Sequence, residues 1–399
     1  MKIIHITASY KPAYIYGGPI QSVAKLCETI VAIRDKRLAV GCDLFNAHDL
    51  QVLTTSANGK TELEVTKAKP ILVDGVLVTY FKRLTKDHSH FSPQLLWNLR
   101  RKILRCTQDD SLAVHIHAWW NLVSVLSCWV AKWYGVQVVL SPRGMLTTYT
   151  QNNRNSFLKK LIHNLIGKNL LKYCHIHATS EQEKQDILQI VKPKSITVIP
   201  NLVNIQKPVS SSELADVHND TTIFRLIFLS RIEEKKGLEL LFDALSLLEI
   251  NWQLTIAGSG KDEYIESLKL KAWNLNIRDR IEWIGQVADE HKYNLMTQHD
   301  LLVLISFNEN FANVVVESLS VGTPVLISNQ VGLADYVSDQ QLGWISNLEI
   351  NEIKETLLKA FSDQEKREMI RQSAPAIIKR DFNEQILVNR YLQLYKSLI

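Results

Sequence analysis

The sequence predicts an α/β protein built from two Rossmann-like domains, and three observations support this fold class. The chain has 399 residues, which is long for one domain and typical of two. Short apolar runs alternate with longer segments of helical periodicity in both halves, a pattern typical of parallel sheets covered by helices on both faces. A polar stretch rich in Ser, Asp and Asn at 206–222 predicts a linker between the two blocks.

Each half contains a series of short apolar runs that we expect to form strands. In the first half they are Lys2–Ala8, Gln51–Thr55, Val76–Phe81, Val114–Ala118, Gln137–Leu140, His175–Thr179 and Ile196–Ile199. In the second half they are Arg225–Leu229, Gln253–Ala257, Ile281–Ile284, Leu301–Ile305, Pro324–Ser328 and Gly343–Ile345. Ligands of doubly wound sheets bind at the carboxyl ends of the strands, so residues just after these runs are the first candidates for a site.

Composition argues against a disulfide-rich, zinc-binding, secreted or membrane-spanning protein. The five cysteines are scattered and form no C-x-x-C, which argues against a disulfide framework or a zinc site and is typical of a reducing cytosol. The N-terminal residues read as a first strand rather than a signal peptide. No apolar run approaches the roughly 20 residues needed to span a bilayer. We therefore expect a cytoplasmic protein.

Charge is distributed unevenly along the chain. Residues 1–205 carry 26 Lys and Arg against 13 Asp and Glu, whereas residues 206–399 carry 20 against 28. A basic half suggests an anionic partner. We favour an anionic membrane surface over nucleic acid; a basic surface without a specific partner is the alternative.

The most informative segment is 306–324, which reads SFNENFANVVVESLSVGTP. It predicts a loop that opens a helix, with Glu309 at the loop and Glu317 about 12 Å further along the axis. Backbone N–H groups at a helix N-terminus bind anionic or hydroxyl-rich ligands. One carboxylate at the loop and one in the helix suit a ligand long enough to touch both, such as a nucleotide sugar.

The spacing E-x7-E, with Phe311 two residues after the first Glu and G-T-P-V after the second, resembles the donor-site signature of glycosyltransferase family 4. These are retaining enzymes of the GT-B fold, in which two Rossmann-like domains face each other across an interdomain cleft. The resemblance implies an acceptor domain at 1–205 and a donor domain at 206–382. It also implies that the C-terminal helix at 383–399 crosses back to the first domain.

The resemblance assigns roles to this segment. Glu317 is expected to bind the ribose hydroxyls of the nucleotide, since a carboxylate can accept two hydrogen bonds from a cis-diol, and Glu309 the hydroxyls of the transferred sugar. The remaining donor-binding residues are expected to be Asn310, Phe311, Ala312 and Asn313. The family often has Gly at 310 and 312; we expect Asn310 to keep a left-handed turn and Ala312 to be needed only for its small size.

Cations follow the first strand of the second half. Ser230-Arg231 and Lys236-Gly237 resemble the family's G-R-x4-K-G signature. Fixed cations stabilise the negative charge that develops on a leaving diphosphate, and Arg231 and Lys236 are our candidates. A solvated charge cluster is the alternative.

The first domain supplies further candidates at the ends of its strands. Gly17 and Gly18 resemble the family's N-terminal Gly-Gly loop, where the backbone approaches the diphosphate; a tight turn is the alternative. His117, at the end of the fourth strand, matches the family histidine that touches the donor sugar, whereas His115 reads better as a core histidine. Metal binding by the pair is not expected, because no third ligand stands nearby in the sequence. Arg143 is a candidate for binding an acceptor phosphate.

Two basic amphipathic stretches, 95–105 and 154–173, can lie on anionic lipid, or their apolar faces can pack on the sheet. The chain has no D-x-D motif, so we expect no metal and no cofactor, with cations in place of a metal at the diphosphate.

Together these features predict a retaining hexosyltransferase that uses a nucleoside-diphosphate sugar, with UDP slightly favoured. The basic first domain suggests a lipid-linked acceptor at the inner face of the cell membrane, as in surface-polysaccharide or lipopolysaccharide assembly. The alternatives are a non-catalytic carbohydrate-binding scaffold and a nucleotide-sugar epimerase. A dehydrogenase is not supported, because no G-x-G-x-x-G follows the first strand.

Overall fold

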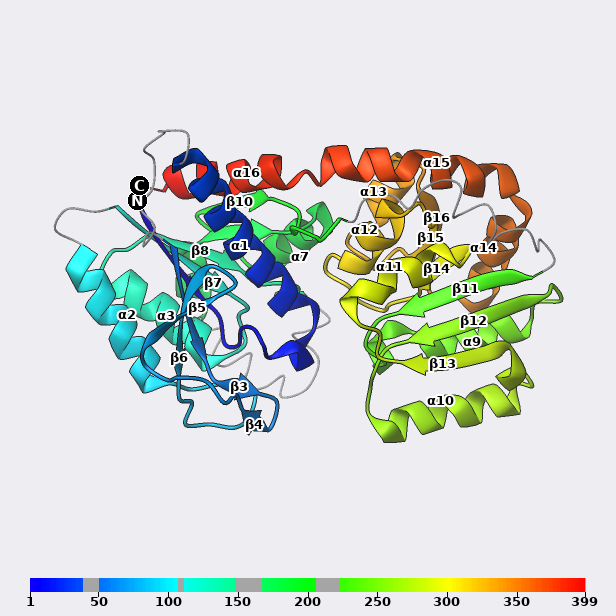
Figure 1. Ribbon diagram of the computed structural model, residues 1–399, viewed down its shortest axis with the longest axis horizontal. Coiled ribbons are helices and arrows are strands. Elements are labelled where there is room, and N and C mark those ends of the chain that lie inside the picture. Colours follow the sequence, from blue (N-terminus) through cyan, green and yellow to red (C-terminus); the bar gives the residue numbers. More distant parts are fainter. Residues whose placement is uncertain (39–49, 107–110, 148–166, 206–222, 399) are drawn as a thin grey trace. The chain divides into compact units, whose positions relative to one another are not determined.

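The computed structural model describes residues 1–38, 50–106, 111–147, 167–205 and 223–398 (Figure 1). Contacts divide the chain into two compact units, each described here by itself. Unit 1 contains Met1–Leu202 and Glu384–Ile399, and unit 2 contains Val203–Asn383. The predicted linker at 206–222 and most of the basic stretch at 154–173 lie outside the described residues.

Unit 1 contains an eight-stranded sheet in the order β10-β9-β8-β7-β1-β2-β6-β5. The pairs are parallel except for β5, which runs antiparallel to β6. The strands are β1 (Lys2–Ile6), β2 (Leu50–Thr55), β5 (Pro70–Val73), β6 (Val76–Phe81), β7 (Leu112–His117), β8 (Val138–Ser141), β9 (His175–Ala178) and β10 (Ser195–Val198). A short hairpin of β3 (Ala57–Asn58) and β4 (Thr61–Glu62) follows β2.

One face of this sheet is apolar. Ile4, Ile116 and Leu140 point to this face and belong to a buried cluster with Leu99 of α2 (Pro93–Cys106) and Val123 of α3 (Leu122–Trp133). The two helices lie side by side (Figure 1). The same cluster includes residues of α6 (Lys168–Tyr173) and α7 (Glu181–Ile190). Successive residues of a strand point to opposite faces, so their neighbours turn toward the other face.

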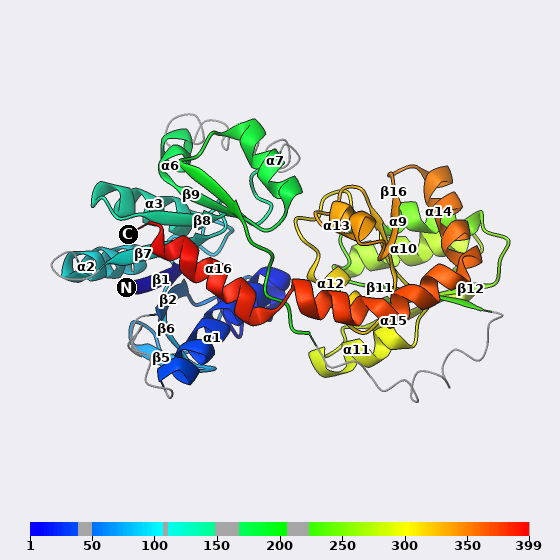
Figure 2. The same cartoon turned by 90° about the horizontal axis from the view of Figure 1, so that it is seen from above.

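The other face meets α1 (Gly18–Leu38) and α16 (Glu384–Lys396), which contact each other and lie side by side (Figure 2). The α16 helix buries Leu387, Tyr391 and Tyr395, at the helical spacing expected for a core-facing stripe. This face is polar at its centre, and its side chains form the site of unit 1 described below.

Unit 2 contains a six-stranded parallel sheet in the order β13-β12-β11-β14-β15-β16. Its strands are β11 (Phe224–Leu229), β12 (Trp252–Ala257), β13 (Ile281–Gly285), β14 (Leu301–Leu304), β15 (Val325–Ser328) and β16 (Gly343–Ser346). Its helices are α9 (Leu238–Ser246), α10 (Asp262–Asn274), α11 (Asp289–Thr297), α12 (Asn313–Ser320), α13 (Ala334–Asp339), α14 (Ile350–Ser362) and α15 (Gln364–Asp381).

The alternating strand and helix pattern is confirmed, since each expected strand overlaps an observed one in a parallel ladder. The sequence analysis missed β5, a four-residue strand, and the β3–β4 hairpin, which lies in a polar stretch with little periodicity. Within the described residues, no helix combines the length and apolar character that a membrane span requires.

Candidate functional site

In unit 2 the segments that follow β11 and β14 lie against each other. Gly237 has a left-handed backbone, with φ of 70°, and a Cβ at this position would stand 1.9 Å from the carbonyl oxygen of Ile305. The Phe307 N–H donates to the Lys235 carbonyl over 2.8 Å. Only glycine fits such a contact. The predicted K-G pair therefore brings Lys236 beside the loop that carries Glu309.

Lys236 and Glu309 form an ion pair between their Nζ and Oε2 atoms, and the Lys236 side chain is nearly buried. Burial alone would raise the pKa of the Glu309 carboxyl, but the charges of Lys236, Lys235 and Arg231 outweigh it and lower this pKa. Arg231 itself donates to Glu233 Oε1 over 2.7 Å and is partly exposed. Three of the predicted residues thus share one electrostatic environment.

The backbone of Glu309 is fixed by the segment that follows β15. Its N–H donates to the Gln330 carbonyl over 3.1 Å, and its own carbonyl accepts from the Gly332 N–H over 2.7 Å. The carboxylate is therefore carried on a backbone anchored to the sheet rather than on an unsupported loop.

The expected turn at Asn310 is wrong, because the left-handed residue is Ala312, with φ of 63° and ψ of 74°. Ala312 precedes Asn313, the first residue of α12, and provides no side-chain cap. Phe311 is buried and its ring meets Phe382 edge-on, 6.1 Å between centroids. The buried ring fixes the loop on one side of Ala312 and the helix fixes it on the other, so the strained backbone falls between them.

Glu317 lies in the second turn of α12 and is buried against Lys292 of α11, 2.9 Å from Oε1 to Nζ. Burial raises the pKa of the Glu317 carboxyl in spite of the opposing charge of Lys292. The sequence analysis missed Lys292, which stands 25 residues away on a helix whose apolar pattern is weak. No signal in one sequence identifies this pairing.

In unit 1 a row of polar side chains crosses the face that meets α16. The strand register places His5 opposite His115, and His117 opposite Ser141. His177 of β9 continues the row. All five are buried, so each must find its hydrogen-bond partner inside the unit.

In this row each hydrogen bond determines the donor and acceptor of the next one, and this fixes the tautomers of the histidines. His177 Nε2 lies 2.8 Å from the Ile199 carbonyl, which can only accept, so His177 Nδ1 accepts from the Ser141 hydroxyl over 2.6 Å. Ser141 then accepts from His115 Nε2 over 2.7 Å, and His115 Nδ1 accepts from the Tyr395 hydroxyl of α16 over 2.7 Å. The network links four elements and requires neutral imidazoles.

His117 belongs to a second branch of this network. Its Nδ1 lies 3.4 Å from both Nε and an Nη of Arg143, which can only donate, so its Nε2 donates to His5 Nδ1 over 2.9 Å. Both ring nitrogens therefore have protein partners. The contact with a donor sugar implied by the resemblance stays a prediction.

No third ligand stands near the histidine pair in the sequence, but His5 joins the pair in space, where His5, His115 and His117 bring ring nitrogens within 4.8 Å of one another. The hydrogen bonds above occupy both nitrogens of His115 and of His117, and the Arg143 guanidinium adjoins the cluster. A cation beside the site and occupied ligand atoms do not fit a metal centre.

Arg143 lies two residues after the end of β8 and has a left-handed backbone, with φ of 53°. Besides His117, its guanidinium donates to Asn201 Oδ1 over 3.2 Å and to Ser22 Oγ over 3.3 Å. Among the described residues all of its hydrogen-bond partners are neutral, so its positive charge is not neutralised by a paired carboxylate. A half-buried cation of this kind is suited to an anionic group.

The turn that carries Arg143 is fixed by Glu183, a residue that the sequence analysis missed. Glu183 accepts from the Gly144 N–H over 2.8 Å and, through its other oxygen, from the Thr179 N–H over 2.7 Å. Ser180 caps α7 by accepting from the Glu183 N–H over 3.1 Å. The S-x-x-E spacing typical of a capping box was the available signal.

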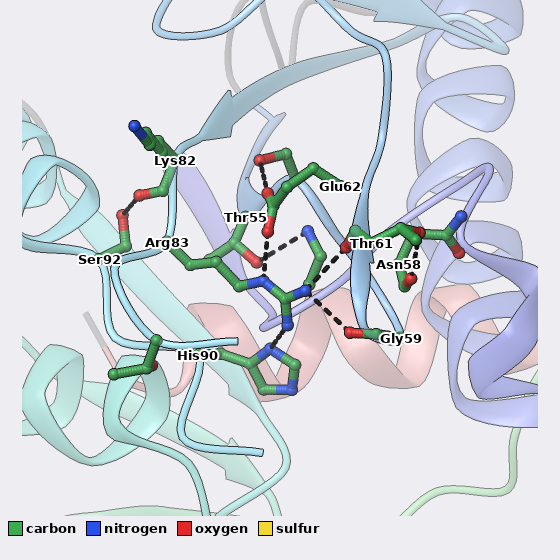
Figure 3. Close-up of polar contacts among 12 residues, drawn as sticks. Thr55, Asn58, Gly59, Thr61, Glu62, Lys82, Arg83, His90 and Ser92 are labelled. Carbon is green, nitrogen blue, oxygen red and sulfur yellow. Dashed lines mark hydrogen bonds and ion pairs between the residues drawn. The ribbon is translucent and has the colours of Figure 1, made fainter. Parts of the chain in front are cut away.

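The Gly17–Gly18 turn opens α1, with φ of 70° at Gly17. The neighbouring Tyr16 hydroxyl accepts from the Gly59 N–H over 2.9 Å. Gly59 in turn belongs to a polar cluster around Arg83, which has a fully buried side chain (Figure 3). Arg83 donates to the carbonyls of Gly59 and Thr61, each over 2.8 Å, and to Glu62 Oε1 over 2.6 Å. This cluster ties the β3–β4 hairpin to the Gly17–Gly18 turn.

We expect Ala312→Gly to increase the free energy of unfolding of unit 2 by up to about 1 kcal/mol. Relief of about 1–2 kcal/mol of left-handed strain exceeds the roughly 0.5–1 kcal/mol of added chain entropy. Urea denaturation measures this, with Ala376→Gly in α15 as the control expected to destabilise by about 1 kcal/mol. A loss of stability in Ala312→Gly equal to that of the control would contradict the assignment of strain.

We expect unit 1 to lose stability as the pH falls below about 6.5. Burial lowers the pKa of His5 and His177 to about 3, and those of His115 and His117 well below the ordinary value. The folded state therefore binds fewer protons than the unfolded state. Between the lowered pKa of the folded state and the ordinary pKa of about 6.5, each histidine contributes a slope of about 1.4 kcal/mol per pH unit. Urea unfolding at pH 7.0 and 5.5 tests this. The control is His291→Gln, which removes an exposed histidine and should leave the pH dependence of stability unchanged. Equal free energies at both pH values would refute it.

Comparison with known proteins was made against family profiles, curated sequences and solved structures. The Glycosyltransferase Family 4 profile matches residues 45–207, and the Glycosyl transferases group 1 profile matches residues 213–376. An uncharacterised glycosyltransferase of Methanocaldococcus jannaschii is 24% identical over 419 aligned residues, covering 99% of this chain and 98% of the relative.

A GDP-mannose:cellobiosyl-diphosphopolyprenol alpha-mannosyltransferase of Xanthomonas oryzae is 22% identical, covering 100% of this chain and 97% of the relative. The crystal structure of Anabaena HepE in complex with UDP and glucose superposes with a TM-score of 0.73 at 19% identity, covering 100% of both chains. These findings confirm the predicted GT-B fold. The protein belongs to glycosyltransferase family 4 and is an enzyme that transfers a sugar from a nucleotide sugar to an acceptor.

Proposed function

We propose that the enzyme transfers a hexose, with retention of anomeric configuration, from a nucleoside-diphosphate sugar to a lipid-linked glycan. The observation that carries this proposal is the pair of buried or half-buried carboxylates of unit 2, each held by its own lysine. Glu309 pairs with Lys236 and Glu317 pairs with Lys292. One carboxylate stands in the loop that precedes α12 and the other within the helix, the arrangement that suits a sugar at one end of the donor and a ribose at the other.

In this proposal Glu317 accepts hydrogen bonds from the ribose hydroxyls and Glu309 from hydroxyls of the hexose. Arg231 and Lys236 lie beside Glu309, where their charges would stabilise the departing diphosphate. We propose that these cations suffice without a metal ion. Phe311 and Asn313 would support the donor mainly through the backbone at the start of α12.

The transfer step needs no protein nucleophile in this scheme. The bond between the anomeric carbon and the diphosphate oxygen breaks, and the acceptor oxygen bonds to the same face of the sugar. The departing phosphate oxygen takes the proton of the acceptor hydroxyl. Gly17 and Gly18 would approach the diphosphate, and Arg143 would bind a phosphate of the acceptor, because its guanidinium contacts only neutral groups among the described residues.

A surface on α2 and α3 supports a membrane-bound acceptor. Trp97, Trp129 and Trp133 are 54%, 48% and 72% exposed, and the rings of the last two lie 5.6 Å apart. The same two helices carry exposed basic side chains, namely those of Arg100, Arg101, Arg105 and Lys132, and the Arg101 guanidinium lies over the Trp97 ring. Tryptophan and basic residues together favour the interface of an anionic bilayer. We propose that unit 1 docks there, at the inner face of the cell membrane.

The relatives are consistent with such an acceptor. The mannosyltransferase of Xanthomonas oryzae is named for a diphosphopolyprenol-linked substrate and for GDP-mannose, whereas Anabaena HepE binds UDP and glucose. The base of the donor nucleotide is therefore tested by binding of the two candidates, UDP and GDP.

We expect Glu317→Ala and Lys236→Ala each to weaken nucleoside-diphosphate binding by tenfold or more, because each removes a charge-assisted contact worth about 1.5–3 kcal/mol. Titration calorimetry with UDP and GDP measures the affinity. Lys271→Ala on α10, which also removes an ion-paired lysine, is the control. Unchanged affinity in both site variants would refute the assignment of the donor site, and so would the absence of binding to wild type.

We expect the Trp129→Ala/Trp133→Ala variant to lose most of its binding to vesicles of anionic phosphatidylglycerol, because two exposed indoles leave the interface. Co-sedimentation with anionic and with zwitterionic vesicles measures this. Trp273→Ala in unit 2 removes an exposed indole that also stacks with an arginine and is the control. Equal loss in the control, or equal binding of wild type to both vesicle types, would contradict the docking surface.

A further inference from the structure

Lys292 is a buried ammonium group that neither the family signature nor the sequence analysis includes. Its side chain is 7% exposed, on α11, and its Nζ lies 2.9 Å from Glu317 Oε1 and 3.0 Å from Asp289 Oδ1. Lysine is rarely buried unless it is paired. Glu317 is 9% exposed and Asp289 is 61% exposed, so Glu317 is the partner that shares the interior.

A contact with an aromatic ring also holds Lys292 in this position. Its Nζ lies over the ring of Tyr293, 5.1 Å from the centroid, a favourable cation–π distance. The Tyr293 hydroxyl donates to the carbonyl of Asn204, which anchors this turn of α11 within unit 2. The ammonium group therefore approaches Glu317 from a supported helix.

Stability alone does not account for such a pair. The desolvation of two buried charges roughly cancels their attraction, and apolar residues of similar volume are often as stable. The pair also uses only one carboxylate oxygen. Among the described residues no hydrogen bond is made to Glu317 Oε2, so this oxygen is available to a ligand.

We propose that Lys292 is a positioning residue for nucleotide recognition. It binds Oε1 of Glu317 and so holds the carboxylate ionised, with Oε2 presented to the ribose hydroxyls of the donor. This inference rests on the proposed function of Glu317 as the ribose-binding residue. Burial raises the pKa of Glu317 and the charge of Lys292 opposes that effect, which is consistent with a lysine that keeps the acceptor oxygens negative.

The experiment compares UDP with 2′-deoxy-UDP, and GDP with 2′-deoxy-GDP, by titration calorimetry on the full chain. Wild type should bind the ribonucleotide about tenfold or more tightly, because the deoxy analogue leaves a charged acceptor without its donor. In Lys292→Met this ratio should fall toward one, since the carboxylate is no longer oriented. Lys292→Arg should retain most of the ratio, because the cation is kept.

Two further variants keep the test decisive. Lys292→Met leaves Glu317 buried without its cation, which destabilises the fold. Lys292→Gln is therefore measured beside it, because the glutamine amide still donates to Oε1. We expect the ratio of ribonucleotide to deoxynucleotide affinity to fall at least threefold in Lys292→Gln. Lys269→Met removes an exposed lysine paired with Glu266 and should leave the ratio unchanged. Thermal melting shows which variants are folded.

The outcomes separate the two proposals. If wild type binds a ribonucleotide with discrimination and a folded Lys292→Met or Lys292→Gln keeps the full ratio, the positioning role is overturned while the donor site stands. If wild type does not discriminate between the ribo and deoxy forms, or binds neither nucleotide, the ribose-binding role of Glu317 fails and this inference fails with it.

Discussion

A buried carboxylate stays ionised only where cations or hydrogen-bond donors replace the water it has lost, and the chemistry of unit 2 depends on cations that do so. Glu309 and Glu317 are each placed beside a lysine from a different part of the chain, Lys236 and Lys292. The two pairs differ in whether burial or the neighbouring cations have the larger effect on the carboxyl pKa. At Glu309 the surrounding cations lower the carboxyl pKa, whereas at Glu317 burial raises it in spite of Lys292. The first carboxylate is therefore held firmly as an anion beside the cations proposed for the diphosphate. The second is more sensitive to its single cation, which makes the position of Lys292 important for ligand recognition.

In unit 1 the row of buried side chains on the face that meets α16 consists of neutral groups, in contrast to the ion pairs of unit 2. Hydrogen bonds with one direction connect Tyr395 of α16 to His115, Ser141 and His177. A second branch runs from Arg143 through His117 to His5. His117 thereby acts as a neutral acceptor that holds the Arg143 guanidinium without neutralising it. The positive charge of Arg143 is preserved at the end of β8, where the carboxyl ends of parallel strands commonly present functional groups.

Much of the fold and part of the site could be predicted from the sequence, since apolar runs and the cluster of Arg231, Lys236, Glu309 and Glu317 are local signals. The contacts of Lys292 and His5 could not, because they join residues brought together only by strand order and helix packing. The left-handed turn was placed at Asn310 on intrinsic preference. The structure places it at Ala312, because the buried Phe311 ring and the start of α12 fix the geometry on either side. Tertiary packing overrode the local preference there. The hairpin that supports the Gly17–Gly18 turn gave no local signal, because its two short strands lie in a polar stretch with little periodicity.

The most direct measurement is a crystal structure of the enzyme soaked with UDP or GDP, whichever binds. We expect ribose hydroxyls at about 3 Å from the Glu317 carboxylate, a hydrogen-bond distance. We also expect the diphosphate beside Arg231 and Lys236, with the Lys236–Glu309 pair still at the loop that precedes α12. A nucleotide bound elsewhere, or one whose ribose faces away from Glu317, would contradict the account of how unit 2 recognises its donor.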